Sequence, residues 1–214
     1  MIKALFLILD PEAAWLGIAT ARRNALSIII RTLIPALLIV ALAEGYGLVK
    51  WGRARPPFGD IRLYSLQEAV MYEGTQMALM VIVILISTYL IKALGETFHG
   101  RHNYTQSFTV VAYALTPLFL VRLLDVIPTV SLWIFWGIGI VLTMKVLYTG
   151  VPRIMEPDPP HALGLYFMSA LLVTMVTCAE RAISIGYLAG KYQPVSQVLT
   201  HVTASILHKL HLGQ

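Results

Sequence analysis

The sequence of 214 residues is 57% hydrophobic and only 13% charged, and its mean hydropathy is +0.74. Soluble domains carry about 25% charged residues, so this composition excludes an ordinary globular domain. The net charge of +5 fits basic residues that flank membrane spans, and because the chain has no basic run we expect no nucleic-acid binding. The single cysteine, Cys178, excludes an internal disulfide and a cysteine-based zinc or redox motif.

Residues 1–24 are predicted to form an interfacial segment that precedes the membrane bundle. An amphipathic helix is expected over residues 13–23, because Asp10 is a suitable N-terminal cap and Pro11 fits a first helical turn. Trp15 of this helix is expected at the level of the lipid headgroups, where tryptophan is enriched.

Five apolar segments are long enough to cross about 30 Å of hydrocarbon, which requires roughly 20 residues in a helix. They are residues 25–49, 67–94, 107–126, 128–149 and 161–189. Pro35 and Pro117 are expected to interrupt the first and third spans, since proline removes a helical hydrogen bond. The sequence thus predicts an all-α integral membrane bundle of five transmembrane helices over residues 25–190, with the N-terminal interfacial helix before it.

The tail, residues 191–214, is predicted to carry an amphipathic helix on the membrane surface. Its apolar residues fall on one helical stripe, with histidines on the opposite side. The 16 Lys and Arg residues divide evenly between the two sides of a five-span bundle, so charge alone does not indicate the orientation.

Seven ionisable residues are expected on one side of the membrane, at or just inside the interface, because of where they lie in the spans. They are Glu44, Glu68, Glu73, Arg122, Asp125, Glu180 and Arg181. Charges inside a membrane are costly and need partners. Two interpretations follow: a polar cavity that binds a cation, a proton or a headgroup, or a set of ion pairs that fixes helix register. Glu73 and Arg122 are the pair we expect first.

Two weak candidates for metal binding lie in the predicted loops. Glu96, His99 and His102 recur at every third position before the third span, and imidazole and carboxylate groups are zinc ligands. Glu156, Asp158 and His161 form a second such group in a proline-rich loop, where Asp158 also suits a helix cap. Both are equally explained as polar loops, so we expect no metal and no cofactor.

A small residue occurs at every fourth position of the fifth span. The positions are Ala170, Thr174, Cys178, Ala182, Gly186 and Gly190. Small residues allow membrane helices to approach closely, which predicts a helix contact, either within the chain or with a second copy or another membrane protein.

The order of these features resembles the Yip-domain family of small membrane proteins, named for interaction with Ypt/Rab proteins. The matching features are Asp10-Pro11 with Trp15 before the first span, the run Ala112-Tyr113-Ala114-Leu115-Thr116-Pro117-Leu118, then Ile127-Pro128 and a tryptophan-bearing fourth span. The resemblance implies five spans and a cytosolic N-terminus. Eukaryotic members bind prenylated Rab GTPases and act in vesicle traffic.

The chain departs from the eukaryotic pattern, because it has no Asp-Leu-Tyr-Gly-Pro motif and no long polar region before the first span. We therefore expect a prokaryotic-type member in the plasma membrane that contacts lipids and does not bind small GTPases. Catalytic motifs such as His-Glu-x-x-His are missing from the sequence, so we expect no enzyme. The expected function is a scaffold or adaptor; the alternative is an ion, proton or small-molecule transporter that uses Glu73, Arg122, Asp125 and Glu180.

Overall fold

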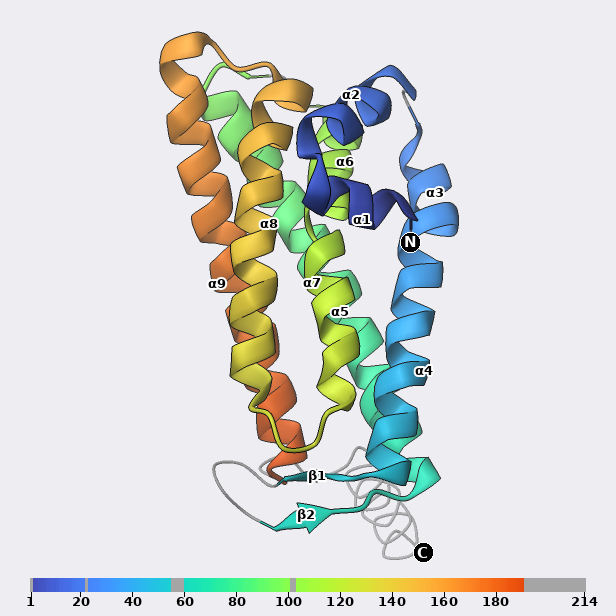
Figure 1. Ribbon diagram of the computed structural model, residues 1–214. Coiled ribbons are helices and arrows are strands. Elements are labelled where there is room, and N and C mark those ends of the chain that lie inside the picture. The colour runs from blue at the N-terminus through green and yellow to red at the C-terminus, as the bar shows by residue number, and fades with distance from the viewer. Residues whose placement is uncertain (1, 22, 55–59, 101–102, 191–214) are drawn as a thin grey trace, which may run out of the picture.

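The computed structural model describes residues 2–21, 23–54, 60–100 and 103–190. Within these residues, five helices are long and apolar enough to cross a membrane, and they run side by side as one bundle (Figure 1). Their bounds are Ala25–Lys50, Leu66–Thr97, Tyr104–Val126, Leu132–Met155 and Pro159–Leu188. The predicted all-α membrane bundle is confirmed, while the predicted surface helix over residues 191–214 lies outside the described residues.

The first span is irregular in its first third, as Pro35 predicts. It consists of α3 (Ala25–Ile28), the π-helical turn η1 (Ile29–Leu33) and α4 (Ile34–Lys50). Pro35 has no N–H to donate to the carbonyl of Arg31, so the regular α-helical pattern fails at this point. The wider π turn directly before the proline accommodates that loss.

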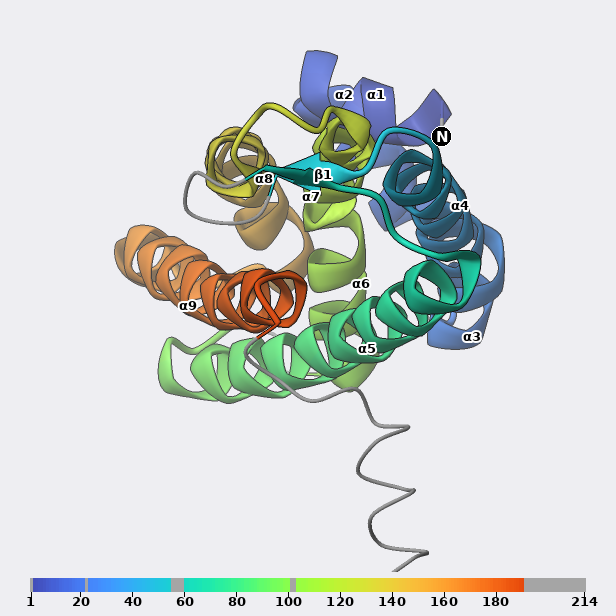
Figure 2. The same ribbon diagram turned by 90° about the horizontal axis from the view of Figure 1, so that it is seen from below.

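The third span is broken at the expected proline and forms the centre of the bundle. It consists of α6 (Tyr104–Ala114), α7 (Thr116–Arg122) and the 3-10 turn η2 (Leu123–Val126). Pro117 leaves the carbonyl of Tyr113 without its helical donor, and the Thr116 hydroxyl donates to that carbonyl instead. In the most apolar stretch of 18 residues of this span, 83% of the residues are buried, against 22–44% in the other four spans. In Figure 2 the third span lies between α4, α5, α8 and α9.

The remaining spans are regular helices with side-chain caps or prolines at their starts. They are α5 (Leu66–Thr97), α8 (Leu132–Met155) and α9 (Ala162–Leu188), the last preceded by the 3-10 turn η3 (Pro159–His161). The Ser65 hydroxyl and the Glu68 carboxylate form a capping box at the start of α5.

The predicted bounds of the fourth span, 128–149, are wrong at both ends. Its helix begins after Ser131, whose hydroxyl accepts a hydrogen bond from the Trp133 N–H. At the other end the helix continues past Pro152 to Met155. Pro152 costs this helix one hydrogen bond, because proline has no N–H to donate to the Tyr148 carbonyl.

Two short helices precede the bundle and pack against it. They are α1 (Ile2–Leu9) and α2 (Pro11–Ala21), and the Asp10 carboxylate accepts a hydrogen bond from the Ala13 N–H as a cap. The expected headgroup position of Trp15 is wrong: its side chain is fully buried. Its indole N–H donates to the Val146 carbonyl of α8 at 3.0 Å, and its ring meets Tyr113 of α6 edge to face. The N-terminal segment is therefore anchored in the bundle.

A short antiparallel hairpin closes the opposite end of the molecule (Figure 1). Its strands are β1 (Arg53–Ala54) and β2 (Ile61–Arg62). Gly52 leads into it with a φ of +70°, and a Cβ there would lie 2.3 Å from the Arg62 carbonyl oxygen. Glycine is required at this position for both reasons.

Gly150 of α8 provides the space that Trp15 fills, which gives a direct test of the docked N-terminal segment. A Cβ at position 150 would lie 2.3 Å from Cζ2 of Trp15. We expect Gly150→Ala to lower the free energy of unfolding by about 1–3 kcal/mol, the usual cost of overpacking, as measured by unfolding in detergent. Gly137→Ala in the same helix is the control, because a Cβ there meets nothing within 4 Å. Equal stability of the two variants would contradict the docking of Trp15.

Candidate functional site

A group of six buried ionisable side chains lies in the half of the bundle nearest the hairpin, and we call it the ionic cluster. Its members are Glu44 of α4, Glu73 of α5, Arg122 of α7, Asp125 of η2, and Glu180 and Arg181 of α9. None of these residues is more than 8% exposed. Four of the five spans supply a charged side chain, although the members are far apart in sequence. These six are among the seven residues that the sequence analysis expected on one side of the membrane.

Arg122 is the centre of the ionic cluster, because it contacts carboxylates from three different elements. Its Nε lies 3.2 Å from Oε2 of Glu44, and its Nη1 lies 3.7 Å from Oε1 of Glu180. Asp125, one helical turn further along, lies 3.9 Å from the same Nε. A planar guanidinium with several fixed donors suits this bridging of carboxylates. Arg122 thus links the first, third and fifth spans.

Arg181 forms the second half of the ionic cluster. Its Nη2 lies 2.6 Å from Oδ2 of Asp125, and its Nε and Nη2 both donate to the carbonyl of Leu132 at the start of α8. That carbonyl belongs to the fourth span, so the fourth span joins the cluster through its backbone. Short charge-assisted hydrogen bonds of this kind are the strong ones.

Two polar residues of the second span complete the network, and the sequence analysis missed both. The Tyr72 hydroxyl donates to Oε1 of Glu44 at 3.2 Å, and Nε2 of Gln76 donates to the Tyr72 hydroxyl at 2.8 Å. Tyr72, Glu73 and Gln76 share one face of α5, since they are one and four positions apart. That polar face in an otherwise apolar span is a signal that the sequence did contain.

Two of the seven predicted cluster residues lie differently from what we expected. Glu68 is outside the cluster: it caps α5 and forms an exposed ion pair with Arg62 at 2.6 Å. Glu73 is buried, but the described residues provide no ion pair between it and Arg122, and its Oε1 has no hydrogen-bond partner there. Glu44 takes the place beside Arg122 that we expected for Glu73, because α4 packs against both α5 and α7.

The cavity beside the two arginines of the ionic cluster is small. A cavity lined by Arg122, Glu180 and Arg181, together with apolar residues including Trp136, has a volume of about 10 Å³. That is at most the space of a single water molecule. The guanidinium groups of Arg122 and Arg181 are therefore satisfied by carboxylates and by the Leu132 carbonyl rather than by water in this cavity.

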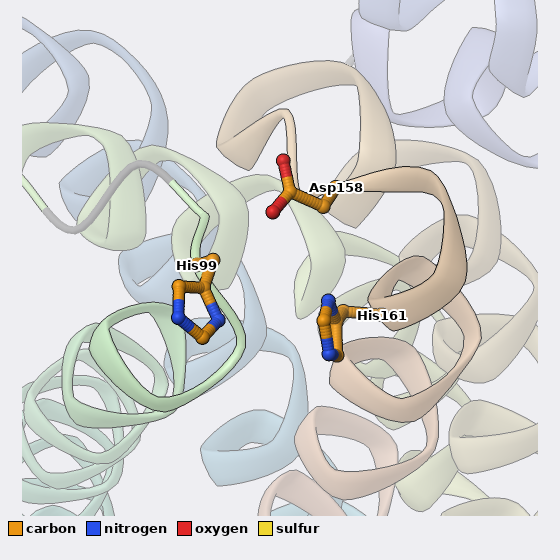
Figure 3. Close-up of side chains that lie close together, drawn as sticks. All are labelled: His99, Asp158 and His161. Atoms are coloured by element: carbon orange, nitrogen blue, oxygen red, sulfur yellow. The ribbon is translucent and has the colours of Figure 1, made fainter.

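The fold separates His99 from Glu96 and places it beside two members of the other candidate metal group. Glu96 remains on α5, where it lies 3.7 Å from Nζ of Lys92, and His102 lies outside the described residues. His99 instead lies beside Asp158 and His161 (Figure 3). Asp158 precedes η3, but its side chain makes no capping hydrogen bond, so that predicted role is wrong.

The predicted small-residue stripe lies along one flank of α9. Ala170 and Gly186 are buried, Thr174 and Cys178 are half-buried, and the two remaining positions, Ala182 and Gly190, are exposed. The buried face of the helix is centred instead on Ser169, Val173, Thr177, Glu180 and Ser184. Only part of the stripe therefore contacts the rest of the chain.

The Glu44–Arg122 pair predicts strong energetic coupling between the first and third spans. Breaking a buried ion pair from one side costs about 3–5 kcal/mol, because a charge is left unpaired. We expect Glu44→Gln and Arg122→Gln each to destabilise the protein, and the double variant to lose much less than the sum of both. The measurement is a double-mutant cycle of unfolding free energies in detergent.

The exposed pair Arg62 and Glu68 is the matched control for this cycle, since exposed pairs contribute only about 0–1 kcal/mol. Purely additive losses at Glu44 and Arg122 would show that the contact carries no coupling energy.

The chain matches a known family of proteins. The family model of the Yip1 domain matches residues 5–179, a stretch that includes the second half of α1, all of α2 and the whole of the first four spans. No curated protein and no solved structure matches the chain. The resemblance seen in the sequence is thereby confirmed: the chain belongs to the Yip1 domain family.

Proposed function

We propose that this protein is a non-enzymatic membrane scaffold or adaptor, which acts by lateral association of its spans. The observation that carries this proposal is the closed ionic cluster. Its ion pairs join charged side chains of the first, third and fifth spans, and the cavity beside Arg122 has a volume of only about 10 Å³. Such a cluster fixes the register of the helices, while large apolar side chains of α4, α5, α8 and α9 remain exposed for contact with lipid or another protein.

We further propose that the protein lies in the plasma membrane of a prokaryotic cell, with its N-terminus in the cytosol. This orientation follows from the family and places α2 on the cytosolic side and the hairpin outside. Cysteine labelling of an Asp60→Cys variant in intact cells tests it, because Asp60 is exposed beside β2. We expect labelling in intact cells. Labelling only after the cells are opened would show that the hairpin lies in the cytosol and that the proposed orientation is wrong.

The second candidate function is transport of protons or cations, and one observation favours it. Oε1 of Glu73 and Oδ1 of Asp125 are buried without a hydrogen-bond partner among the described residues. Carboxylate side chains inside a span are found in ion pathways and proton relays. The two functions require different behaviour of Glu73: a transporter needs it to exchange ions with water, whereas a scaffold needs it only to pack against Gly45.

Association of two copies through the fifth span tests the scaffold proposal. Cys178 is the single cysteine of the chain, is half-buried and lies on the small-residue flank of α9. In a symmetric dimer the same surface meets itself, so we expect oxidative cross-linking in membranes to give a Cys178-linked dimer. Thr174→Leu should reduce the yield several-fold, because added bulk keeps the helices apart.

The control moves the cysteine to another face of the same helix. Ile183 is 41% exposed and lies about 140° around α9 from Cys178. An Ile183→Cys variant in a Cys178→Ser background should cross-link poorly. Equal yields at both positions would indicate random collisions and would contradict specific association through this flank.

A further inference from the structure

Two loops meet at the end of the bundle opposite the ionic cluster, and each brings metal-binding side chains. The connection between α5 and α6 supplies His99, and the connection between α8 and α9 supplies Asp158 and His161. One ligand atom from each of the three residues lies within 4.8 Å of the other two. Figure 3 shows the two imidazole rings and the carboxylate around one common space.

Close packing holds the two loops together. A Cβ at Gly100 would lie 3.2 Å from the Met155 carbonyl oxygen, and a Cβ at Gly164 would lie 2.7 Å from Cε1 of Phe98. The Phe98 ring also lies edge to face against His161, with centroids 6.5 Å apart. The juxtaposition of the three side chains is thus built into the packing of α5 against α9.

Within the part of the chain that the structure describes, the side chains of His99, Asp158 and His161 form no hydrogen bond or ion pair. Nδ1 of His161 is buried and has no hydrogen-bond partner among the described residues, which normally costs free energy. The Asp158 carboxylate does not cap η3, although its residue stands in the cap position. His99 has a φ of +53°, a backbone conformation that is uncommon outside glycine and is found at functional sites.

We propose that His99, Asp158 and His161 form a binding site for a divalent transition-metal ion of the zinc type. Two imidazoles and one carboxylate are a typical three-residue zinc ligand set, with a fourth position left for water or another ligand. Imidazole favours zinc, copper or nickel over magnesium or calcium. Ligand atoms of tetrahedral zinc lie about 3.3–3.6 Å apart, as bond lengths of about 2.0–2.2 Å require. The three ligand atoms lie within 4.8 Å of one another, so the exposed side chains of His99 and Asp158 need to move only about an ångström closer to reach this spacing.

A metal ion at this site would join the connection of the second and third spans to that of the fourth and fifth. It would act at the end of the bundle that carries α2, far from the ionic cluster. The site is independent of the scaffold proposal, since it requires neither self-association nor a partner.

Binding of zinc to the full-length protein in detergent tests the site, with the protein purified without a histidine tag. We expect the wild type to bind one more Zn²⁺ per chain than His161→Ala and Asp158→Asn, by metal analysis after dialysis. Zinc should also raise the melting temperature of the wild type and not that of either variant, because an ion that binds the folded state stabilises it. Asp158 is exposed, so its variant should fold even if the buried part of His161 is needed for packing.

Glu96→Gln is the matched control. Glu96 lies one turn before His99 and would be a ligand only if the metal were bound along α5, as the sequence spacing suggests. We expect this variant to bind zinc as the wild type does, and histidines 201, 208 and 211 contribute equally to all variants. Equal zinc content in the wild type and Asp158→Asn, or a loss in Glu96→Gln, would overturn the proposed ligand set.

Discussion

Arg122 must be paired, because a guanidinium buried inside a membrane bundle is stable only when carboxylates surround it. Its partners, Glu44, Asp125 and Glu180, come from α4, η2 and α9. Arg181 then joins Asp125 to the Leu132 carbonyl at the start of α8. A shift of any of these helices by one turn would leave charges unpaired. The ionic cluster therefore fixes the relative positions of the spans at this end. Apolar contacts alone would fix them less well, because an apolar side chain can contact lipid as favourably as it contacts another helix.

The central third span makes that arrangement possible. The break at Pro117 separates α6 from α7, so the upper part packs among α5 and α8 while the lower part carries Arg122 toward α4. Thr116 satisfies the carbonyl that the proline leaves free. At the other end of the bundle, Trp15 fills the space above Gly150 and ties α2 to α8. Different interactions thus hold the two ends: ion pairs at one, and an aromatic contact with close loop packing at the other.

The sequence predicted the spans well because length and hydropathy alone decide what can cross a membrane. It also predicted the breaks at Pro35 and Pro117, which follow from a missing N–H. It predicted which side the ionisable residues share, but not their partners, because pairing depends on helix rotation and neighbour order. Glu44 rather than Glu73 therefore lies beside Arg122. Trp15 was misplaced because the glycine that receives it, Gly150, is 135 residues further along the chain. His99 and His161 were assigned to separate groups for the same reason.

The tight pairing of the ionic cluster supports our proposal that the protein conducts no protons or cations. The direct measurement is proton and cation flux into liposomes that contain the purified protein, under an imposed pH gradient or membrane potential. We expect flux equal to that of protein-free liposomes, for the wild type and for Glu73→Gln alike, with Glu96→Gln as an exposed control. Flux above this background in the wild type and in Glu96→Gln, but lost in Glu73→Gln, would contradict the scaffold proposal and identify the ionic cluster as a transport pathway.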